Sequence, residues 1–215
     1  MSQERAKAMI NKPRAHFQDP LKLGPRIAGK LHSEWLRLTY PFVSIGSKVS
    51  IHPSCFIDRR KAHRIQLGSN IRIEKDACLG LSVPEEEEGE PIIIIEDNVV
   101  IHWRTQIGGK NRIHIERDVL IAQDVLIVDQ NHAYEDTSIP IGDQGFTEGG
   151  TIRIGQGSYI GHGSAIICNR GDIELGRNCV VAAHAMVTKS FPPFRSYTEI
   201  PQWLSGSSIP SSKLG

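Results

Sequence analysis

A single histidine, His132, lies near the start of a 23-residue stretch, 129–151, that interrupts an otherwise regular sequence. An imidazole has an unperturbed pKa of about 6.5, so it can accept a proton near neutral pH and return it later. Asp129, Glu135 and Asp136 are the nearby carboxylates that can orient such a ring, and the sequence favours none of them. The residue types therefore permit general base chemistry in this stretch.

The sequence around this stretch repeats every six residues. Six segments between about 45 and 191 each carry three aliphatic residues at that spacing, and every one is Ile, Leu or Val. The positions are Ile45, Ile51, Ile57; Leu67, Ile73, Leu79; Ile95, Ile101, Ile107; Ile115, Ile121, Ile127; Ile154, Ile160, Ile166; Leu175, Val181 and Val187. A period of six fits neither a helix nor an alternating strand, but it fits a coil of three short strands joined by tight corners.

The repeat predicts an all-β solenoid of about six coils, and three parts of the chain follow from it. Residues 1–42 form an N-terminal extension, residues 43–191 the repeat with its loop at 129–151, and residues 192–215 a C-terminal tail. Insertions of this length in a solenoid project from one face and usually carry function.

The N-terminal extension contains an apolar stripe at Ile27, Leu31, Trp35 and Leu38, which predicts an amphipathic helix from about 26 to 39. We expect this helix to cap the open end of the coil stack. Residues 1–42 also hold eight Lys and Arg against three Asp and Glu. A basic helix can instead rest on anionic membrane lipid or on a phosphate-bearing lipid carrier, so peripheral membrane contact stays open.

Composition narrows the class of protein. The 215 residues carry a net charge of +1 and are 39% hydrophobic, which indicates neither a nucleic-acid partner nor a disordered chain. No apolar run reaches the roughly 20 residues of a membrane span. The first residues lack the apolar segment of a signal peptide, so we expect a cytoplasmic protein.

Cysteine and histidine spacing does not indicate a metal. Cys55 and Cys179 occupy positions where a small apolar residue recurs, and Cys78 and Cys168 lack a CxxC partner, so reduced thiols are expected. The γ-class carbonic anhydrases, which are zinc enzymes with a related coil, use two histidines five residues apart. No two histidines of this chain have that spacing, and we expect no metal.

Over about 43–195 the chain resembles the hexapeptide-repeat acyltransferases, and within them the sugar and polysaccharide O-acetyltransferases. The resemblance rests on NHAYED at 131–136, IPI at 139–141, GF at 145–146, IG at 154–155 and 160–161, VTK at 187–189 and PP at 192–193. It implies that the coils wind as a left-handed parallel β-helix, and that the protein is a homotrimer with its sites between neighbouring subunits.

The resemblance also implies roles for individual residues. His132 matches the catalytic base of the family, and Asn131 and Arg104 match acceptor-binding positions. Residues that match acetyl-CoA contacts are Tyr159, His162, Ala183, Thr188 and Lys189. Three departures stand against the family pattern: TEIPQ at 198–202 replaces a glycine-containing turn, His184 replaces a frequent glycine, and Arg104 replaces an acceptor-binding asparagine.

The expected function is acetyl transfer from acetyl-CoA to a hydroxyl of a saccharide, a precursor of a surface polysaccharide. Two alternatives remain open. The same base can serve an amine of an amino sugar, which would make the protein an N-acetyltransferase. The altered segment 198–202 is also compatible with an inactive scaffold or binding protein.

Overall fold

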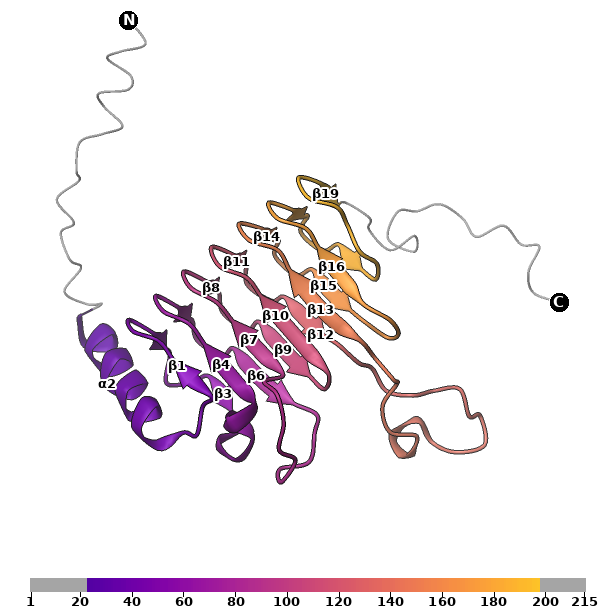
Figure 1. Ribbon diagram of the computed structural model, residues 1–215, viewed down its shortest axis with the longest axis horizontal. Coiled ribbons are helices and arrows are strands. Elements are labelled where there is room, and N and C mark those ends of the chain that lie inside the picture. The colour runs from indigo at the N-terminus through magenta and orange to yellow at the C-terminus, as the bar shows by residue number, and fades with distance from the viewer. Residues whose placement is uncertain (1–22, 198–215) are drawn as a thin grey trace, which may run out of the picture.

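The computed structural model describes residues 23–197, so the altered segment at 198–202 and most of the predicted tail lie outside the described residues. The strands form three parallel sheets along one stack of coils (Figure 1). Each complete coil contributes one strand to every sheet. The predicted all-β solenoid is confirmed.

We name the sheets A, B and C in the order in which the chain visits them. Sheet A contains β1 (Ser44–Ile45), β4 (Ile65–Leu67), β7 (Ile93–Ile95), β10 (Arg112–Ile115), β13 (Thr151–Ile154) and β16 (Ile173–Leu175). Sheet B contains β2 (Ser50–Ile51), β5 (Arg72–Ile73), β8 (Val100–Ile101), β11 (Leu120–Ile121), β14 (Tyr159–Ile160), β17 (Val180–Val181) and β19 (Ser196–Tyr197). Sheet C contains β3 (Phe56–Ile57), β6 (Cys78–Leu81), β9 (Gln106–Gly109), β12 (Leu126–Val128), β15 (Ala165–Ile167) and β18 (Met186–Val187).

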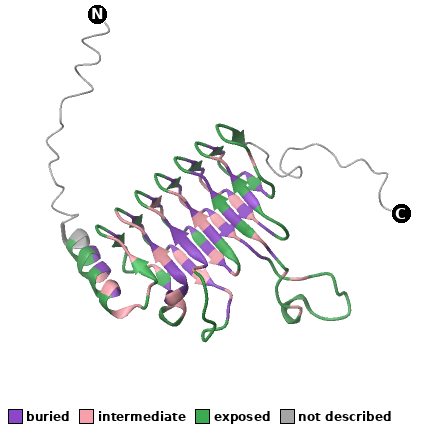
Figure 2. Cartoon of the chain, in the orientation of Figure 1, coloured by how far each residue is buried: buried purple, intermediate pink, exposed green. Residues whose placement is uncertain are grey.

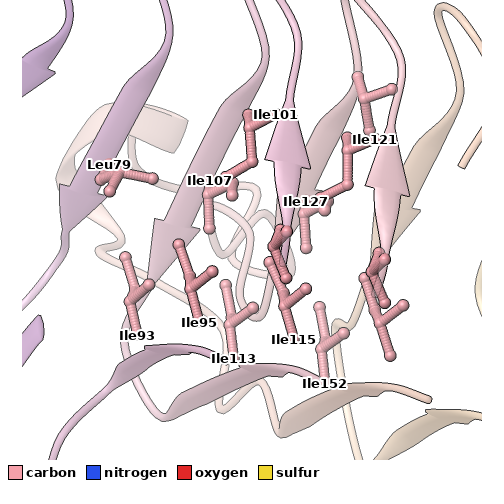
Figure 3. Packing of buried hydrophobic residues seen from close by; sticks show 14 of the residues in the cluster. Leu79, Ile93, Ile95, Ile101, Ile107, Ile113, Ile115, Ile121, Ile127 and Ile152 are labelled. Atoms are coloured by element: carbon pink, nitrogen blue, oxygen red, sulfur yellow. The ribbon is translucent and has the colours of Figure 1, made fainter. Parts of the chain in front are cut away.

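The aliphatic residues of the repeat form the core in the predicted register. Ile115, for example, pairs with Ile95 of the coil before it and with Ile154 of the coil after it. Of the eighteen repeat positions, all but Ile45 are buried, and Ile45 is partly buried against the same core. Figure 3 shows part of this core, with Ile95, Ile115 and Ile121 among the side chains stacked inside the coils. Burying each such side chain contributes about 1.5–3 kcal/mol, so the stack of isoleucines is the main source of stability.

The corners between the strands depend on residues in the left-handed conformation. Asn98, Asp118 and Asp124 adopt it with φ of 61°, 62° and 60°. Asn and Asp tolerate this conformation better than other residues that carry a Cβ. Arg104 (φ 56°) and His184 (φ 58°) adopt it as well. His184 therefore takes the backbone conformation that Gly163 (φ 64°), its equivalent in the preceding coil, adopts without strain.

Helix α2 (Leu23–Thr39) lies at the N-terminal end of the stack (Figure 1). The Ser33 hydroxyl accepts a 2.8 Å hydrogen bond from the Ile51 amide, and the Arg37 guanidinium donates to the carbonyl oxygens of Ile45 (2.7 Å) and Gly46 (2.6 Å). The helix therefore satisfies backbone groups at the open edge of the first coil, and the predicted cap is confirmed. No helix in residues 23–197 has both the length and the apolar character to cross a bilayer.

The face that α2 turns to the coils is not its apolar stripe. Leu36 and Ser33 are its buried side chains, with relative exposures of 3% and 2%. The apolar stripe lies on the opposite side: Ile27, Leu31, Trp35 and Leu38 are 51%, 67%, 52% and 83% exposed. The apolar stripe does not face the coils because the end of a coil stack presents polar backbone groups as well as apolar side chains. A narrow face of small and polar residues meets those groups better than a broad apolar one.

All three insertions leave the stack at the corner between sheet C and sheet A. The first is the 3₁₀ helix η2 (Arg59–Arg64), which the sequence analysis did not predict. The second is the acidic segment 82–92, and the third is the segment 129–150, which contains η3 (Ile141–Asp143). Figure 1 shows the third projecting furthest from the coils, and Figure 2 shows it largely exposed.

Candidate active site

The projecting segment 129–150, called the long loop below, is anchored at its base by Asp129. This side chain is fully buried, and its carboxylate accepts hydrogen bonds from the backbone amides of Lys110 (2.7 Å) and Asn111 (2.8 Å). The Gly150 amide donates to the Asp129 carbonyl oxygen at 3.0 Å and joins the two ends of the loop. Burial raises the pKa of the Asp129 carboxyl, while the amide donors act in the opposite direction.

Gly150 is required where the loop rejoins the coils. A Cβ atom there would collide with the backbone oxygen of Gly171 in the next coil. The loop therefore returns to the stack along a path that admits no side chain.

Above this base the two arms of the loop pair with each other. His132 and Phe146 form an antiparallel bridge, and their rings stack with centroids 5.0 Å apart and planes inclined by 27°. The Asn131 side-chain oxygen accepts a 2.9 Å hydrogen bond from the His132 amide, and the Asn131 amide donates to the Thr147 hydroxyl at 2.9 Å. Asn131 and Phe146 thus fix the backbone and ring plane of His132.

The His132 ring is exposed and open to an incoming group. Within the described part of the chain, neither ring nitrogen makes a hydrogen bond. The three carboxylates considered from the sequence do not orient it here: Asp129 faces the amides at the loop base, Asp136 accepts from Ser138, and Glu135 is exposed. The imidazole can therefore accept a proton from a bound substrate without first breaking an internal contact.

A second polar cluster lies at the corner between sheet B and sheet C. The Arg104 guanidinium donates two hydrogen bonds of 2.6 Å to the Asp124 carboxylate. The Nδ1 atom of His162 lies 3.5 Å from the same carboxylate and 3.0 Å from the Gln123 carbonyl oxygen. His184 packs edge-on against His162, with ring centroids 5.0 Å apart. Hydrogen bonds from Arg104 lower the pKa of Asp124.

The residues expected to contact acetyl-CoA divide between two corners and a sheet face. His162 and the exposed Ala183 lie at the corner between sheets B and C. Thr188 and Lys189 follow β18, at the corner from which the long loop also leaves. Tyr159 points outward from sheet B and is 40% exposed, in a row with Leu120 and Val180.

Within one chain the structure brings some of these residues together and keeps others apart. Asn131 contacts His132, and Arg104 joins His162 through Asp124. The strand β12 separates these two groups, and a strand with its flanking residues spans about 13 Å. Asp124 and the pairing of His162 with His184 were not predicted from the sequence. The signal was available in part, because all three residues fall at the same corner of successive coils: Asp124 and His184 occupy equivalent positions, and His162 lies one position earlier.

The cysteines and metal-binding side chains offer no second kind of chemistry among residues 23–197. All four cysteines are free thiols. Burial raises the pKa of the Cys55 thiol to about 11, and it also raises the pKa values of Cys78 and Cys168. No three His, Cys, Asp or Glu side chains in the described range are grouped so that they could hold a metal ion.

Comparison with known proteins relates the chain to acetyltransferases. No protein-family model matches the sequence. The chain is 27% identical over 157 residues to the "Probable acetyltransferase Rv3034c" of Mycobacterium tuberculosis, covering 73% of this chain and 47% of that protein. It is 28% identical over 134 residues to the "Putative lipopolysaccharide biosynthesis O-acetyl transferase WbbJ" of Escherichia coli, covering 60% of this chain and 67% of that protein. The chain thus spans about half the length of the first relative.

Among solved structures, the fold is similar to AntD, an N-acyltransferase from Bacillus cereus. A mutant of AntD in complex with dTDP and coenzyme A has a TM-score of 0.62 and 22% identity, covering 78% of this chain and 85% of AntD. Another, in complex with dTDP-4-amino-4,6-dideoxyglucose and coenzyme A, has a TM-score of 0.61 and 22% identity, covering 79% and 85%. The predicted left-handed parallel β-helix and the predicted resemblance to acyltransferases are confirmed.

Proposed function

We propose that this protein transfers an acetyl group from acetyl-CoA to a hydroxyl of a saccharide that is a precursor of a surface polysaccharide. The observation that carries the proposal is the position of His132. Its exposed ring is fixed by Asn131 and Phe146 on the long loop of a β-helix. Two further facts support it. Both curated relatives are named as acetyltransferases, one of them in lipopolysaccharide biosynthesis, and AntD binds coenzyme A on the same fold.

In the proposed reaction, a neutral His132 accepts the proton of the sugar hydroxyl as the oxygen attacks the thioester carbonyl. The tetrahedral oxyanion is stabilised by backbone N–H donors at a corner of the coil. Collapse of this intermediate forms the ester and breaks the carbon–sulfur bond. The departing CoA sulfur takes the proton back from the imidazolium, so the histidine ends the cycle neutral.

Direct transfer agrees with the state of the cysteines. A covalent acyl intermediate on cysteine needs a thiolate, and the raised pKa values of Cys55, Cys78 and Cys168 keep these thiols protonated at neutral pH. No serine of the long loop contacts His132. A ternary complex of both substrates is therefore the simplest scheme.

For acetyl-CoA we propose a groove lined by Tyr159, His162, Ala183, Thr188 and Lys189. Small side chains such as Ala183 allow the pantetheine arm to approach the backbone, and the Lys189 ammonium can pair with a phosphate of CoA. For the acceptor we propose Asn131 and Arg104. Because Arg104 already holds Asp124, its use by the acceptor requires a partial exchange of that contact.

We also propose a homotrimer with its active sites between subunits. The outward positions of sheet B include Leu120, Tyr159 and Val180, which are 39%, 40% and 41% exposed. The outward face of sheet A differs, because ion pairs such as Arg153–Glu174 (2.9 Å) cover it. Apolar exposure on one face and charge on another favour burial of sheet B against a second copy. A neighbouring subunit would also complete a site whose two groups of residues lie at opposite ends of β12 in one chain.

N-acylation of an amino sugar is the second candidate. It is favoured by the likeness to AntD, an N-acyltransferase whose complexes include dTDP-4-amino-4,6-dideoxyglucose. An imidazole can deprotonate an amine as it attacks, so the loop alone does not discriminate between the two nucleophiles. The product does: mild hydroxylamine releases acetyl groups held as esters and leaves amides intact.

The test of the proposal is the variant His132→Ala. We expect acetyl transfer to fall by about 10²–10⁴-fold, the usual contribution of a general base. Acetyl-CoA binding, measured by calorimetry, and the sedimentation coefficient should remain those of the natural protein. The matched control is Tyr134→Ala, which changes an exposed aromatic residue of the same loop and should keep most of the activity.

Two outcomes would contradict the proposal. Turnover of His132→Ala within a few-fold of the unmodified enzyme would remove His132 as the base. If titration of acetyl-CoA into the unmodified protein gives no saturable heat, the protein is an inactive scaffold or binding protein instead.

A further inference from the structure

We propose that the exposed apolar face of α2 docks the protein on the surface of an anionic lipid bilayer. The face consists of Ile27, Leu31, Trp35 and Leu38 and is called the α2 stripe below. All four are more than half exposed. Successive residues of a helix are rotated by about 100°, which places the stripe opposite the residues Ser33 and Leu36 that pack on the first coil. The coils hold one side of the helix, and the other side is an apolar surface that includes a tryptophan.

A cleft with two arginines continues this surface. It has a volume of about 390 Å³ and is lined by Leu38, Thr39, Tyr40, Pro41, Arg59 and Arg60. Leu38 is also the last member of the α2 stripe. Arg59 donates one hydrogen bond to the Thr39 carbonyl oxygen (2.8 Å), which positions its guanidinium at the cleft. Arg60 is 68% exposed and pairs with Glu85 (2.7 Å) and more distantly with Asp58 (3.6 Å). Exposed pairs of this kind are weak and exchange readily for a phosphate.

The charge of the chain is strongly divided along its length. Residues 1–42 carry eight Lys and Arg against three Asp and Glu, whereas the remaining residues carry 17 Lys and Arg against 21 Asp and Glu. The whole chain is close to neutral, so this asymmetry does not follow from overall composition. A basic segment beside an exposed apolar helix face is the combination that binds the interface of an anionic membrane.

The same charge argues against a second copy of the chain as the occupant. Two stripes packed together would bring two copies of α2 side by side. Each copy holds Arg26, Lys30 and Arg37 against one acid, Glu34, and Glu34 already pairs with Arg37 (3.2 Å). An anionic bilayer neutralises that charge and accepts the apolar side chains at the level of its headgroups. No step of acetyl transfer enters this inference, so it stands or falls independently of the proposed function.

The test uses the fluorescence of Trp35 in the full chain. The variant Trp103→Phe/Trp203→Phe leaves Trp35 as the single tryptophan of the protein. We expect its emission to shift to the blue with vesicles of phosphatidylcholine and phosphatidylglycerol, and to be quenched by lipids brominated near the headgroup. Phosphatidylcholine alone should give a much smaller effect, and high salt should weaken binding to the anionic vesicles.

Substitutions in the stripe test the assignment. Leu31→Ser/Leu38→Ser should weaken partition of the protein into anionic vesicles, measured by cosedimentation, by about tenfold or more because two exposed apolar side chains are lost. The matched control is Phe194→Ser at the far end of the stack. Phe194 is about as exposed as Leu31 (64% and 67%), and its substitution should leave partition unchanged. Circular dichroism of both variants verifies that they fold.

Several outcomes would overturn the inference. Absence of a shift with anionic vesicles would show that the stripe does not meet lipid. If the Trp35 emission is already blue-shifted without vesicles and shifts to the red on dilution, the stripe binds a second copy of the chain. If the blue-shifted emission does not depend on concentration but shifts to the red when residues 1–22 are removed, the stripe binds the N-terminal segment of the same chain.

Discussion

Arg104 shows how a corner residue can have both a structural and a binding role. It adopts the left-handed conformation, and both of its hydrogen bonds go to Asp124 one coil further on. The pair therefore links the corners of two adjacent coils. The same carboxylate of Asp124 lies 3.5 Å from the Nδ1 atom of His162. Arg104 is therefore linked through Asp124 to a residue that we propose contacts acetyl-CoA.

We predict that Arg104→Ala raises the pKa of the Asp124 carboxyl toward its ordinary value. The folded-state pKa of Asp124 is depressed, so its contribution to stability is present above the ordinary carboxyl pKa and is lost as the pH falls through the folded value. Removal of Arg104 should abolish that part of the acid dependence. NMR titration of the Asp124 carboxyl measures the pKa directly.

The control for this prediction is Arg72→Ala. Arg72 pairs with Glu74 at 3.5 Å and lies two coils away from Asp124 along the stack. It should leave the Asp124 titration unchanged. An Asp124 pKa that stays equally depressed in Arg104→Ala would show that another group, such as His162, holds it down.

At the scale of the element, the long loop is defined by its anchor as much as by its tip. Asp129 accepts from two backbone amides of the preceding coil, and the side chains of Lys110 and Asn111 donate to the carbonyl oxygens of Thr147 (2.8 Å) and Glu148 (3.1 Å). Both ends of the loop are thus tied to one tight corner. This arrangement holds His132 at a defined place although most of the loop is exposed.

We predict that Asp129→Ala destabilises the protein by about 2 kcal/mol and impairs transfer. Two backbone N–H groups lose their acceptor, which costs about 1–3 kcal/mol for each buried group, and relief from burying a carboxylate offsets part of this cost. Urea unfolding measures the stability. Amide hydrogen exchange at Lys110 and Asn111 should accelerate, which would locate the effect at the anchor.

The matched control is Asp143→Ala, since Asp143 is an exposed acid in the same loop. It should change the free energy of unfolding by no more than a few tenths of a kcal/mol. Equal destabilisation by the two substitutions would mean that the loop is not anchored through Asp129.

The elements differed in how well the sequence predicted them, and the reason is physical. The coils were predictable because each inward position meets the same residue type in the coils before and after it, as Ile95, Ile115 and Ile154 do. The orientation of α2 was not, because a helix at the end of a stack is selected by hydrogen bonds to edge groups. Ser33 and Arg37 make those bonds, and hydropathy does not register them.

The candidate site was predictable in the same uneven way. The long loop and His132 stand out because they break the repeat. Asp124 does not, because an aspartate at a left-handed corner is expected for backbone reasons alone. Only the geometry shows that its carboxylate also joins Arg104 to His162.

At the scale of the whole molecule, the outer surfaces differ in character. Sheet A carries polar contacts such as the Glu96–His114 hydrogen bond (2.8 Å) and the Arg153–Glu174 ion pair (2.9 Å), which suit a face in water. Sheet B exposes a row of apolar side chains, and α2 exposes another at the end of the stack. One chain therefore offers separate surfaces for a second copy and for a membrane, so the two proposed contacts do not compete.

We predict that Leu120→Glu/Val180→Glu converts the protein to a monomer and strongly reduces transfer. Both residues point outward, about 40% exposed, so single chains lose little core packing. In a subunit interface the two carboxylates would be desolvated without partners, which is costly enough to dissociate it. Analytical ultracentrifugation of the unmodified protein should give three times the mass of one chain, and the same measurement on the variant should give the mass of one chain.

The control Gln66→Glu, on the outer face of sheet A, should leave the mass unchanged. A monomer before any substitution, or an active monomer after it, would show that the active site is complete within one chain.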